Sequence, residues 1–118
     1  LVTDAMPTVG QQDTTFFLNG DRISVRGGVC QNRDGTLAGS DLDMAQAVAN
    51  ATKLLGVSLT EAIRLASANP ARMLGLDCKT GSLQVGLAAD LVELSDDGLV
   101  MRTWIAGQRV WDRADSLT

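Results

Sequence analysis

The sequence predicts an α/β fold in which strands come first, helices follow and strands return. Three observations support this order. Short apolar and β-branched runs flank the turn pair Asn19-Gly20, apolar residues recur with helical spacing from Met44 onward, and strand-like runs resume after Thr80. The outer β segments are expected to belong to a sheet layer that needs other strands to complete it.

The N-terminal segment opens with the apolar strand Leu1–Asp4, which ends in a carboxylate and leads into a loop over residues 5–14. Asn19-Gly20 is the kind of pair that forms a tight hairpin turn. Short strands are predicted on both sides of it, at residues 16–18, 22–26 and 29–30. This part of the chain should therefore form a small β-meander.

Two helices are predicted in the middle of the chain. Ser40 is expected to cap the first helix, with Asp43 as an acidic variant of the capping box, and Gly56 to end it. The apolar residues of this helix recur at three- and four-residue steps: Met44, Val48, Ala51 and Leu55. Ser58 and Glu61 form a second capping box. The helix that they open carries four apolar residues, Ala62, Ile63, Leu65 and Ala66.

The last third of the chain is predicted to hold a short helical turn and four strands. Asn69 is expected as the N-cap of the turn, Pro70 as its first helical residue, and Gly75 as the place where it closes. The strands are predicted at residues 82–85, 89–94, 100–105 and 109–111. Turns are predicted at residues 96–98 and 106–108.

The composition favours one compact, ordered and soluble domain. The chain has 118 residues, of which 45% are hydrophobic and 20% charged. Its net charge of −4 and its dispersed Lys and Arg residues argue against nucleic acid as a partner. No apolar run approaches the roughly 18 residues that span a bilayer, so no membrane partner is expected either.

The cysteine and histidine content restricts the chemistry. Cys30 and Cys78 form no CxxC motif and lie far apart, which favours two reduced, partly buried thiols and is typical of a cytoplasmic protein. Histidine is absent. A Ser/His/Asp triad, a Cys/His dyad and a His-rich zinc site are therefore excluded within these residues, and any metal chemistry needs ligands from elsewhere.

Two segments are the main candidates for chemistry. Asp4 ends a predicted strand, where a carboxylate acts as general base or metal ligand, or only turns a loop. Gly35–Ser40 is predicted as a loop that opens a helix; it would hold an anion or a sugar hydroxyl, or be an ordinary capped start. Arg72 is a third candidate, as a phosphate ligand or as a solvated or structural residue. Asp90 is expected to make a turn or strand-start contact, and Trp104 and Trp111 are expected to be core or interface anchors.

In their order and spacing, these features resemble the C-terminal part of the N-acetylglucosamine-6-phosphate deacetylases, a family of the amidohydrolase superfamily. The resemblance runs through nearly the whole chain. Four stretches carry it: Leu1–Met6, Gly35–Ser40, Ala68–Gly75 and Gly86–Val92. The last two are shared widely among amidohydrolases, whereas the first two, at their particular distance, narrow the match to the sugar-phosphate deacetylases.

The resemblance implies a C-terminal fragment of a metal-dependent (β/α)8 barrel plus part of a small β-sandwich, within the α/β class. Residues 1–79 would hold the eighth barrel strand, the inserted β-meander and the closing helices, and residues 80–118 the last strands of the sandwich. By the same match Asp4 is the catalytic acid/base. The residues that line the site of the amino-sugar phosphate are Leu37, Ala38 and Gly39.

The resemblance also implies a divalent metal, zinc or similar, held by a Glu and two His from earlier barrel strands. Phosphate ligands would lie upstream or in the second subunit of a homodimer. None of these residues lies in this chain, which begins inside a predicted strand and is expected to be a piece of a longer protein. Alone, the chain should neither bind zinc tightly nor deacetylate.

The implied activity is hydrolysis of N-acetylglucosamine 6-phosphate to glucosamine 6-phosphate and acetate, a step of amino-sugar catabolism. One alternative is an amidohydrolase that acts on a different N-acetyl hexosamine phosphate. The other is a self-sufficient, non-catalytic module that binds a partner. The unpaired edge of the predicted first strand argues against this module.

Overall fold

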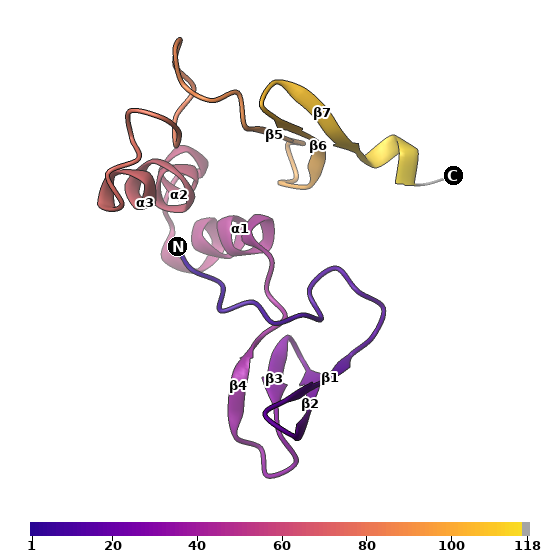
Figure 1. Ribbon diagram of the computed structural model, residues 1–118. Helices are drawn as coiled ribbons and strands as arrows, with labels where there is room; N and C mark the ends of the chain where they lie inside the picture. Colours follow the sequence, from indigo (N-terminus) through magenta and orange to yellow (C-terminus); the bar gives the residue numbers. More distant parts are fainter. Residues whose placement is uncertain (117–118) are drawn as a thin grey trace. The chain divides into compact units, whose positions relative to one another are not determined.

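The computed structural model describes residues 1–116 and confirms the order of strands, helices and strands (Figure 1). The elements are β1 (Thr15–Leu18), β2 (Asp21–Arg26), β3 (Val29–Gln31), β4 (Leu37–Ser40), α1 (Met44–Leu55), α2 (Leu59–Ala66), α3 (Ala68–Met73), β5 (Leu91–Leu94), β6 (Val100–Ile105), β7 (Gln108–Asp112) and η1 (Arg113–Ser116). Contacts within the chain divide it into two compact units. One unit is Val2–Ala47, and the other consists of Leu1 and the residues from Val48 onward.

The first unit contains a four-stranded antiparallel sheet with the order β1-β2-β3-β4. Asn19 and Gly20 join β1 to β2 with φ angles of 52° and 90°, as a two-residue turn of the primed type requires. Ile23 and Cys30 are the buried side chains of the sheet. The predicted meander is therefore confirmed.

The prediction of a loop at Gly35–Ser40 is wrong for most of its length. Leu37–Ser40 forms β4, which pairs with β3 through Cys30 and Gly39 and has a register shift beside this pair. The residues Leu-Ala-Gly-Ser carry no strong strand preference of their own. Pairing with β3, which is a tertiary contact, therefore decides the conformation of this segment.

The predicted strand at Leu1–Asp4 is also wrong, since none of its residues lies in a strand of the described chain. Its backbone groups make separate hydrogen bonds rather than a ladder: the Thr3 carbonyl accepts from the Ser40 hydroxyl, and the Asp4 carbonyl accepts from the Ser40 amide. The one β-type contact nearby is a parallel bridge between Ala5 and Ser40. A strand needs a neighbour along its whole length, and this segment meets one only at its end.

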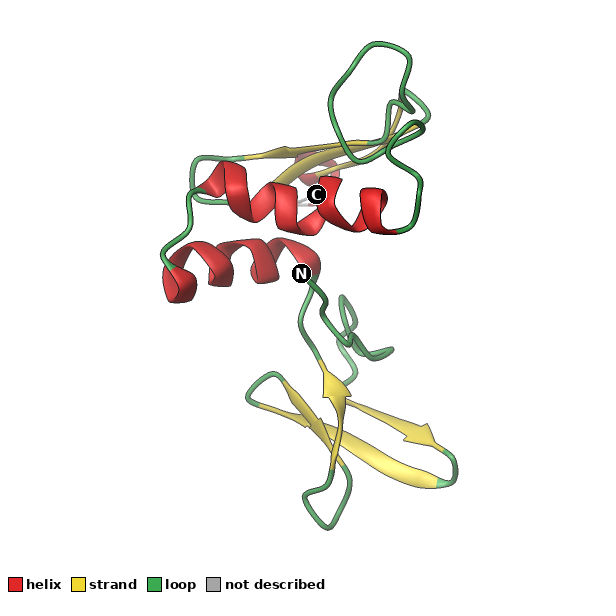
Figure 2. Cartoon of the chain, turned by 90° about the vertical axis from the view of Figure 1, so that its left-hand side faces the viewer, coloured by secondary structure: helices red, strands yellow, loops and turns green. Residues whose placement is uncertain are grey.

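Helix α1 begins at Met44, four residues beyond the predicted cap at Ser40. Asp43 caps it instead, because its carboxylate accepts a hydrogen bond of 2.7 Å from the Gln46 amide. Gly56, with a φ of 67°, follows the last helical residue as predicted. Helix α1 lies along α2 and α3 (Figure 2).

A small apolar cluster holds the helices of the second unit together. Val48 and Ala51 of α1 pack against Ala62 of α2, and Leu1 lies against this cluster. Ser58 caps α2 as predicted, accepting a hydrogen bond from the Glu61 amide. The predicted apolar face of α1 is correct at its centre only, because Met44 and Leu55 are exposed.

Helix α3 begins two residues before the predicted Pro70, with Ser67 rather than Asn69 at the capping position and Pro70 third in the helix. Pro is tolerated there because N–H groups in the first turn have no intrahelical partner. The predicted end is confirmed. The Gly75 amide donates to the Arg72 carbonyl and the Leu76 amide to that of Ala71, which is the Schellman pattern.

The second unit also contains a three-stranded antiparallel sheet with the order β5-β6-β7. Ala106 and Gly107 form the predicted hairpin turn with φ angles of 51° and 78°, and the Gly98 amide closes the predicted turn after β5. The predicted strand at residues 82–85 is wrong. Leu83 and Val85 are exposed in a loop there, since no neighbouring strand of the described chain pairs with them.

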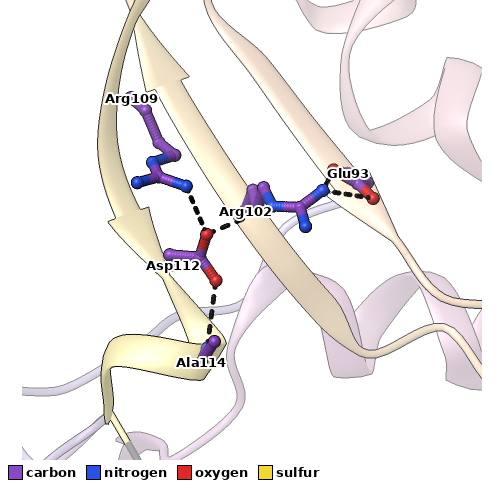
Figure 3. A network of polar contacts seen from close by, with 5 residues as sticks. All are labelled: Glu93, Arg102, Arg109, Asp112 and Ala114. Atoms are coloured by element: carbon purple, nitrogen blue, oxygen red, sulfur yellow. Dashed lines mark hydrogen bonds and ion pairs between the residues drawn. The ribbon is translucent and has the colours of Figure 1, made fainter.

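Ion pairs link charged side chains of all three strands of this second sheet (Figure 3). Arg102 in β6 forms ion pairs with Glu93 at 2.8 Å and with Asp112 at 3.1 Å, and Arg109 approaches Asp112 at 2.6 Å. The hydrogen bond with Glu93, followed by that with Asp112, raises the pKa of Arg102. The Ala114 N–H, together with Arg102 and Arg109, lowers the pKa of the Asp112 carboxyl.

Cys30 and Cys78 are both free thiols, as predicted, but Cys30 is completely buried and Cys78 is exposed. Among residues 1–116, none of the helices is long and apolar enough to cross a bilayer.

Candidate functional site

Asp4 lies in the first unit, and its backbone conformation is unusual. Its φ angle is 52°, in the left-handed region that residues with a side chain seldom adopt, and its side chain is exposed. Asp and Asn enter this region more readily than most residues because their short polar side chains bond locally. The chain therefore turns sharply at the carboxylate that the sequence singled out.

Leu37, Ala38 and Gly39 lie on β4, at the edge of the four-stranded sheet. Leu37 is 67% exposed, Ala38 is half-buried and Gly39 is buried. Leu37 pairs with Gln31 and Gly39 with Cys30, so Ala38 stands at the register shift between them. A bulge of this kind exposes and re-aims backbone groups at a sheet edge.

The structure brings Asp4 directly against Gly39. A Cβ atom on Gly39 would lie 3.0 Å from the Asp4 carbonyl oxygen and 2.5 Å from Cγ of Met6. Only glycine permits this approach, and its φ of 128° is likewise unfavourable for other residues. The predicted catalytic carboxylate and the end of the predicted substrate segment therefore belong to one local structure.

Ser40 joins the two segments. Its amide donates to the Asp4 carbonyl at 2.9 Å, its carbonyl accepts from the Met6 amide at 2.9 Å, and its hydroxyl donates to the Thr3 carbonyl at 2.5 Å. From the sequence, Ser40 was predicted to cap a helix and to end the candidate loop Gly35–Ser40, not to contact Thr3 or Asp4. Nothing in the sequence pairs Ser40 with a residue 37 positions earlier, so this role could not be found without the structure.

The chemistry available at this site is that of one exposed carboxylate beside a strand edge. A carboxylate can accept a proton from water and later return it. Backbone N–H and C=O groups at a strand edge can hold a polar ligand. In residues 1–116, no group of three or more His, Cys, Asp or Glu side chains could hold a metal ion, so the residues present do not by themselves fit one.

The other residues that the sequence singled out lie in α3 and in or beside the sheet β5-β6-β7. The Asp90 carboxylate accepts a hydrogen bond of 2.8 Å from the Ala106 amide, which confirms the predicted contact at a strand start. Arg72 is exposed in α3. Trp104 is half-buried in β6 and Trp111 is 38% exposed in β7.

Comparison with known proteins gives consistent matches over most of the chain. Residues 5–110 match the model of the amidohydrolase family. N-acetylgalactosamine-6-phosphate deacetylase of Escherichia coli O157:H7 is 47% identical over 92% of the chain, and N-acetylglucosamine-6-phosphate deacetylase of Vibrio furnissii is 37% identical over 98%. The chain spans 29% of the length of each of these two relatives.

The solved structures agree with the sequence relatives. The crystal structure of N-acetylglucosamine-6-phosphate deacetylase from Pasteurella multocida superposes with a TM-score of 0.87 at 35% identity. The match covers 92% of this chain and 28% of that one. The conformation of the described chain is thus similar to a part of a larger protein.

Proposed function

The chain belongs to the amidohydrolase family, and on this premise we propose that it forms part of an enzyme that hydrolyses the N-acetyl group of N-acetylglucosamine 6-phosphate. The products are glucosamine 6-phosphate and acetate. The observation that carries the proposal is the placement of the exposed Asp4 against Gly39, the end of the segment expected to line the sugar site. Amide hydrolysis needs a proton acceptor close to the bound substrate, and a carboxylate next to strand β4 would supply one.

In this proposal Asp4 is the general base and then the general acid. Its carboxylate accepts a proton from the water that attacks the acetyl carbonyl, and it gives that proton to the amine as the C–N bond breaks. Exposure of Asp4 leaves its carboxylate accessible to both reactants. Leu37, Ala38 and Gly39 hold the sugar and take no part in bond cleavage.

Amidohydrolases are generally metal-dependent, and a bound divalent ion supplies Lewis-acid chemistry to such enzymes. Because residues 1–116 hold no cluster that fits an ion, the ligands of zinc or a similar metal would come from outside this chain. The phosphate ligands would do so as well, from upstream residues or from a second subunit of a homodimer.

In the proposed architecture, the chain contributes to two parts of a larger protein. Residues 1–79 would supply the last strand region, an inserted sheet and the closing helices of a (β/α)8 barrel. Residues 80–118 would contribute strands to a small β-sandwich. The two free thiols favour a reducing, cytoplasmic location.

A second candidate substrate is N-acetylgalactosamine 6-phosphate. The Escherichia coli O157:H7 relative named for this substrate is 47% identical, against 37% for the Vibrio furnissii relative named for the glucosamine compound. The two sugars differ only in the orientation of one hydroxyl group. Comparison of kcat/KM for the two purified substrates discriminates between the candidates.

Substitution of Asp4 tests the proposal in the complete protein that carries this chain. Asp4→Asn keeps the shape of the side chain but removes its proton acceptor, and should lower kcat about 100- to 10,000-fold with little change in KM. The measurement is the release of acetate from each substrate. Asp21→Asn, at an exposed carboxylate in the β1–β2 hairpin, is the matched control and should keep full activity. Equal rates for Asp4→Asn and wild type would refute the role of Asp4.

A further inference from the structure

Ser40 uses its backbone and its side chain on the same short segment. The hydroxyl bonds to the Thr3 carbonyl, the amide to the Asp4 carbonyl, and the carbonyl to the Met6 amide. The hydroxyl oxygen also accepts a hydrogen bond of 3.2 Å from the Leu42 amide. Both functions of the hydroxyl are therefore occupied, and its direction is determined by two partners.

These bonds anchor both peptide groups that flank Asp4. The Thr3 carbonyl belongs to the peptide group before the Asp4 Cα atom, and the Asp4 carbonyl belongs to the one after it. Each peptide group is planar, so the two planes together set φ and ψ of Asp4. The direction of the bond from Cα to Cβ, which carries the carboxylate, is set with them.

The conformation that is held in this way is an unfavourable one. At a φ of 52°, Asp4 lies in the left-handed region, which is unfavourable for a residue with a side chain, although less so for Asp than for most others. Conformations of this kind persist only when their surroundings determine them fully. The hydroxyl of Ser40 supplies such a contact, from the strand that carries Leu37, Ala38 and Gly39.

We infer that Ser40 is a positioning residue, whose hydroxyl holds the Thr3–Asp4 peptide so that the Asp4 carboxylate points toward the sugar held by Leu37–Gly39. This inference rests on the proposed function for its catalytic meaning. It assigns to Ser40 no contact with the reacting atoms. Its effect is on the direction of Asp4, so it should alter the rate of the chemical step rather than substrate affinity.

The test compares Ser40→Ala with Ser40→Thr in the complete protein, with N-acetylglucosamine 6-phosphate as substrate. Ser40→Ala removes the hydroxyl and should lower kcat about 10- to 100-fold while KM stays within about twofold, because misplacement of a reacting group slows chemistry by such factors. Ser40→Thr keeps a hydroxyl at the same place and should restore most of kcat. Ser24→Ala removes a half-buried hydroxyl from β2 of the same sheet and should leave kcat unchanged.

A double-mutant cycle separates positioning from general stability. If Ser40 acts through Asp4, Ser40→Ala should have no further effect on kcat in the Asp4→Asn background. The inference would be overturned if Ser40→Ala lowered kcat by the same factor in the wild-type and the Asp4→Asn backgrounds. A rise in KM with unchanged kcat, or an unchanged kcat in Ser40→Ala, would also overturn it.

Hydrogen exchange of the Met6 and Ser40 amides keeps the test independent of turnover. In Ser40→Ala, both amides should exchange faster than in wild type and in Ser24→Ala. If the wild-type protein fails to turn over either sugar phosphate, the proposed function fails. Faster exchange would then still support the hold on the Asp4 backbone, and unchanged protection would refute it.

Discussion

At the residue scale, Gly39 occupies a position where the surrounding atoms leave no room for a side chain. The residue is buried, its φ angle is 128°, and both Met6 and the Asp4 carbonyl lie where a side chain would begin. The close approach allows Ser40, its neighbour in the chain, to bond with Thr3 and Asp4. One glycine therefore permits the contact between the segment of the carboxylate and the segment that is proposed to hold the substrate.

We predict that Gly39→Ala destabilises the protein by about 2–4 kcal/mol, from the backbone strain and the collision together. Gly35→Ala is the matched control. Gly35 also has a positive φ, of 82°, but a Cβ atom built there would meet no other atom. This variant should therefore lose only about 1 kcal/mol, from the backbone strain. Chemical denaturation measures both changes. Equal losses for the two variants would mean that the contact with Met6 relaxes freely.

At the element scale, ion pairs link the three strands of the sheet β5-β6-β7. Asp112 is nearly buried and accepts hydrogen bonds from Arg102, Arg109 and the Ala114 amide (Figure 3). All of these partners favour the ionised carboxylate, the Ala114 amide most of all, so the pKa of Asp112 is lower in the folded protein than in the unfolded chain. Such a group stabilises the fold above its unfolded pKa, and the stabilisation is lost as the pH falls through the folded value.

We therefore expect Asp112→Asn to lower the free energy of unfolding at pH 7 and to make it less dependent on pH below about pH 4. The measurement is a series of denaturant midpoints between pH 7 and pH 2. Asp97→Asn, at an exposed carboxylate in the turn between β5 and β6, should behave like wild type over this range. A parallel shift of the Asp112→Asn curve at every pH would show that the charge is not what stabilises the sheet.

At the scale of the whole molecule, the chain belongs to the amidohydrolase family and spans 29% of the length of two of its relatives. Asp4 and β4 come together within residues 1–116, but these residues contain no cluster that could hold a metal. Large apolar side chains are exposed in the second unit as well, among them Leu54, Met73, Leu83 and Val85. Contiguous exposed apolar surface is typical of places where a partner or a ligand binds.

We predict that the 118-residue chain alone neither binds zinc stoichiometrically nor deacetylates either sugar phosphate. Metal analysis after dialysis and an acetate-release assay measure the two properties, with the complete protein as the positive control. Tight, stoichiometric zinc or clear turnover by the chain alone would contradict the prediction. Inactivity of the complete protein as well would instead favour a non-catalytic binding module.

The sequence by itself determined the elements whose cause is local. Asn19-Gly20 and Ala106-Gly107 form their hairpin turns because neighbouring residues suit positive φ angles, and Ser58 caps α2 through an amide three residues away. The contact of Asp90 with Ala106 also agrees with its expected place at a strand start. Such interactions join residues that are near in the chain or across one hairpin, so their pattern can be read along it.

Only the tertiary structure decided the conformation of Leu1–Asp4 and of Leu37–Ser40. The first was predicted as a strand and is held by single hydrogen bonds, and the second was predicted as a loop and is a strand. The role of Asp4 in the candidate site stays a prediction from its residue type and from the family resemblance, and its partner Ser40 was not predicted. Pairing between segments more than 30 residues apart depends on which surfaces meet in three dimensions. The local secondary-structure propensity of a segment does not contain this information.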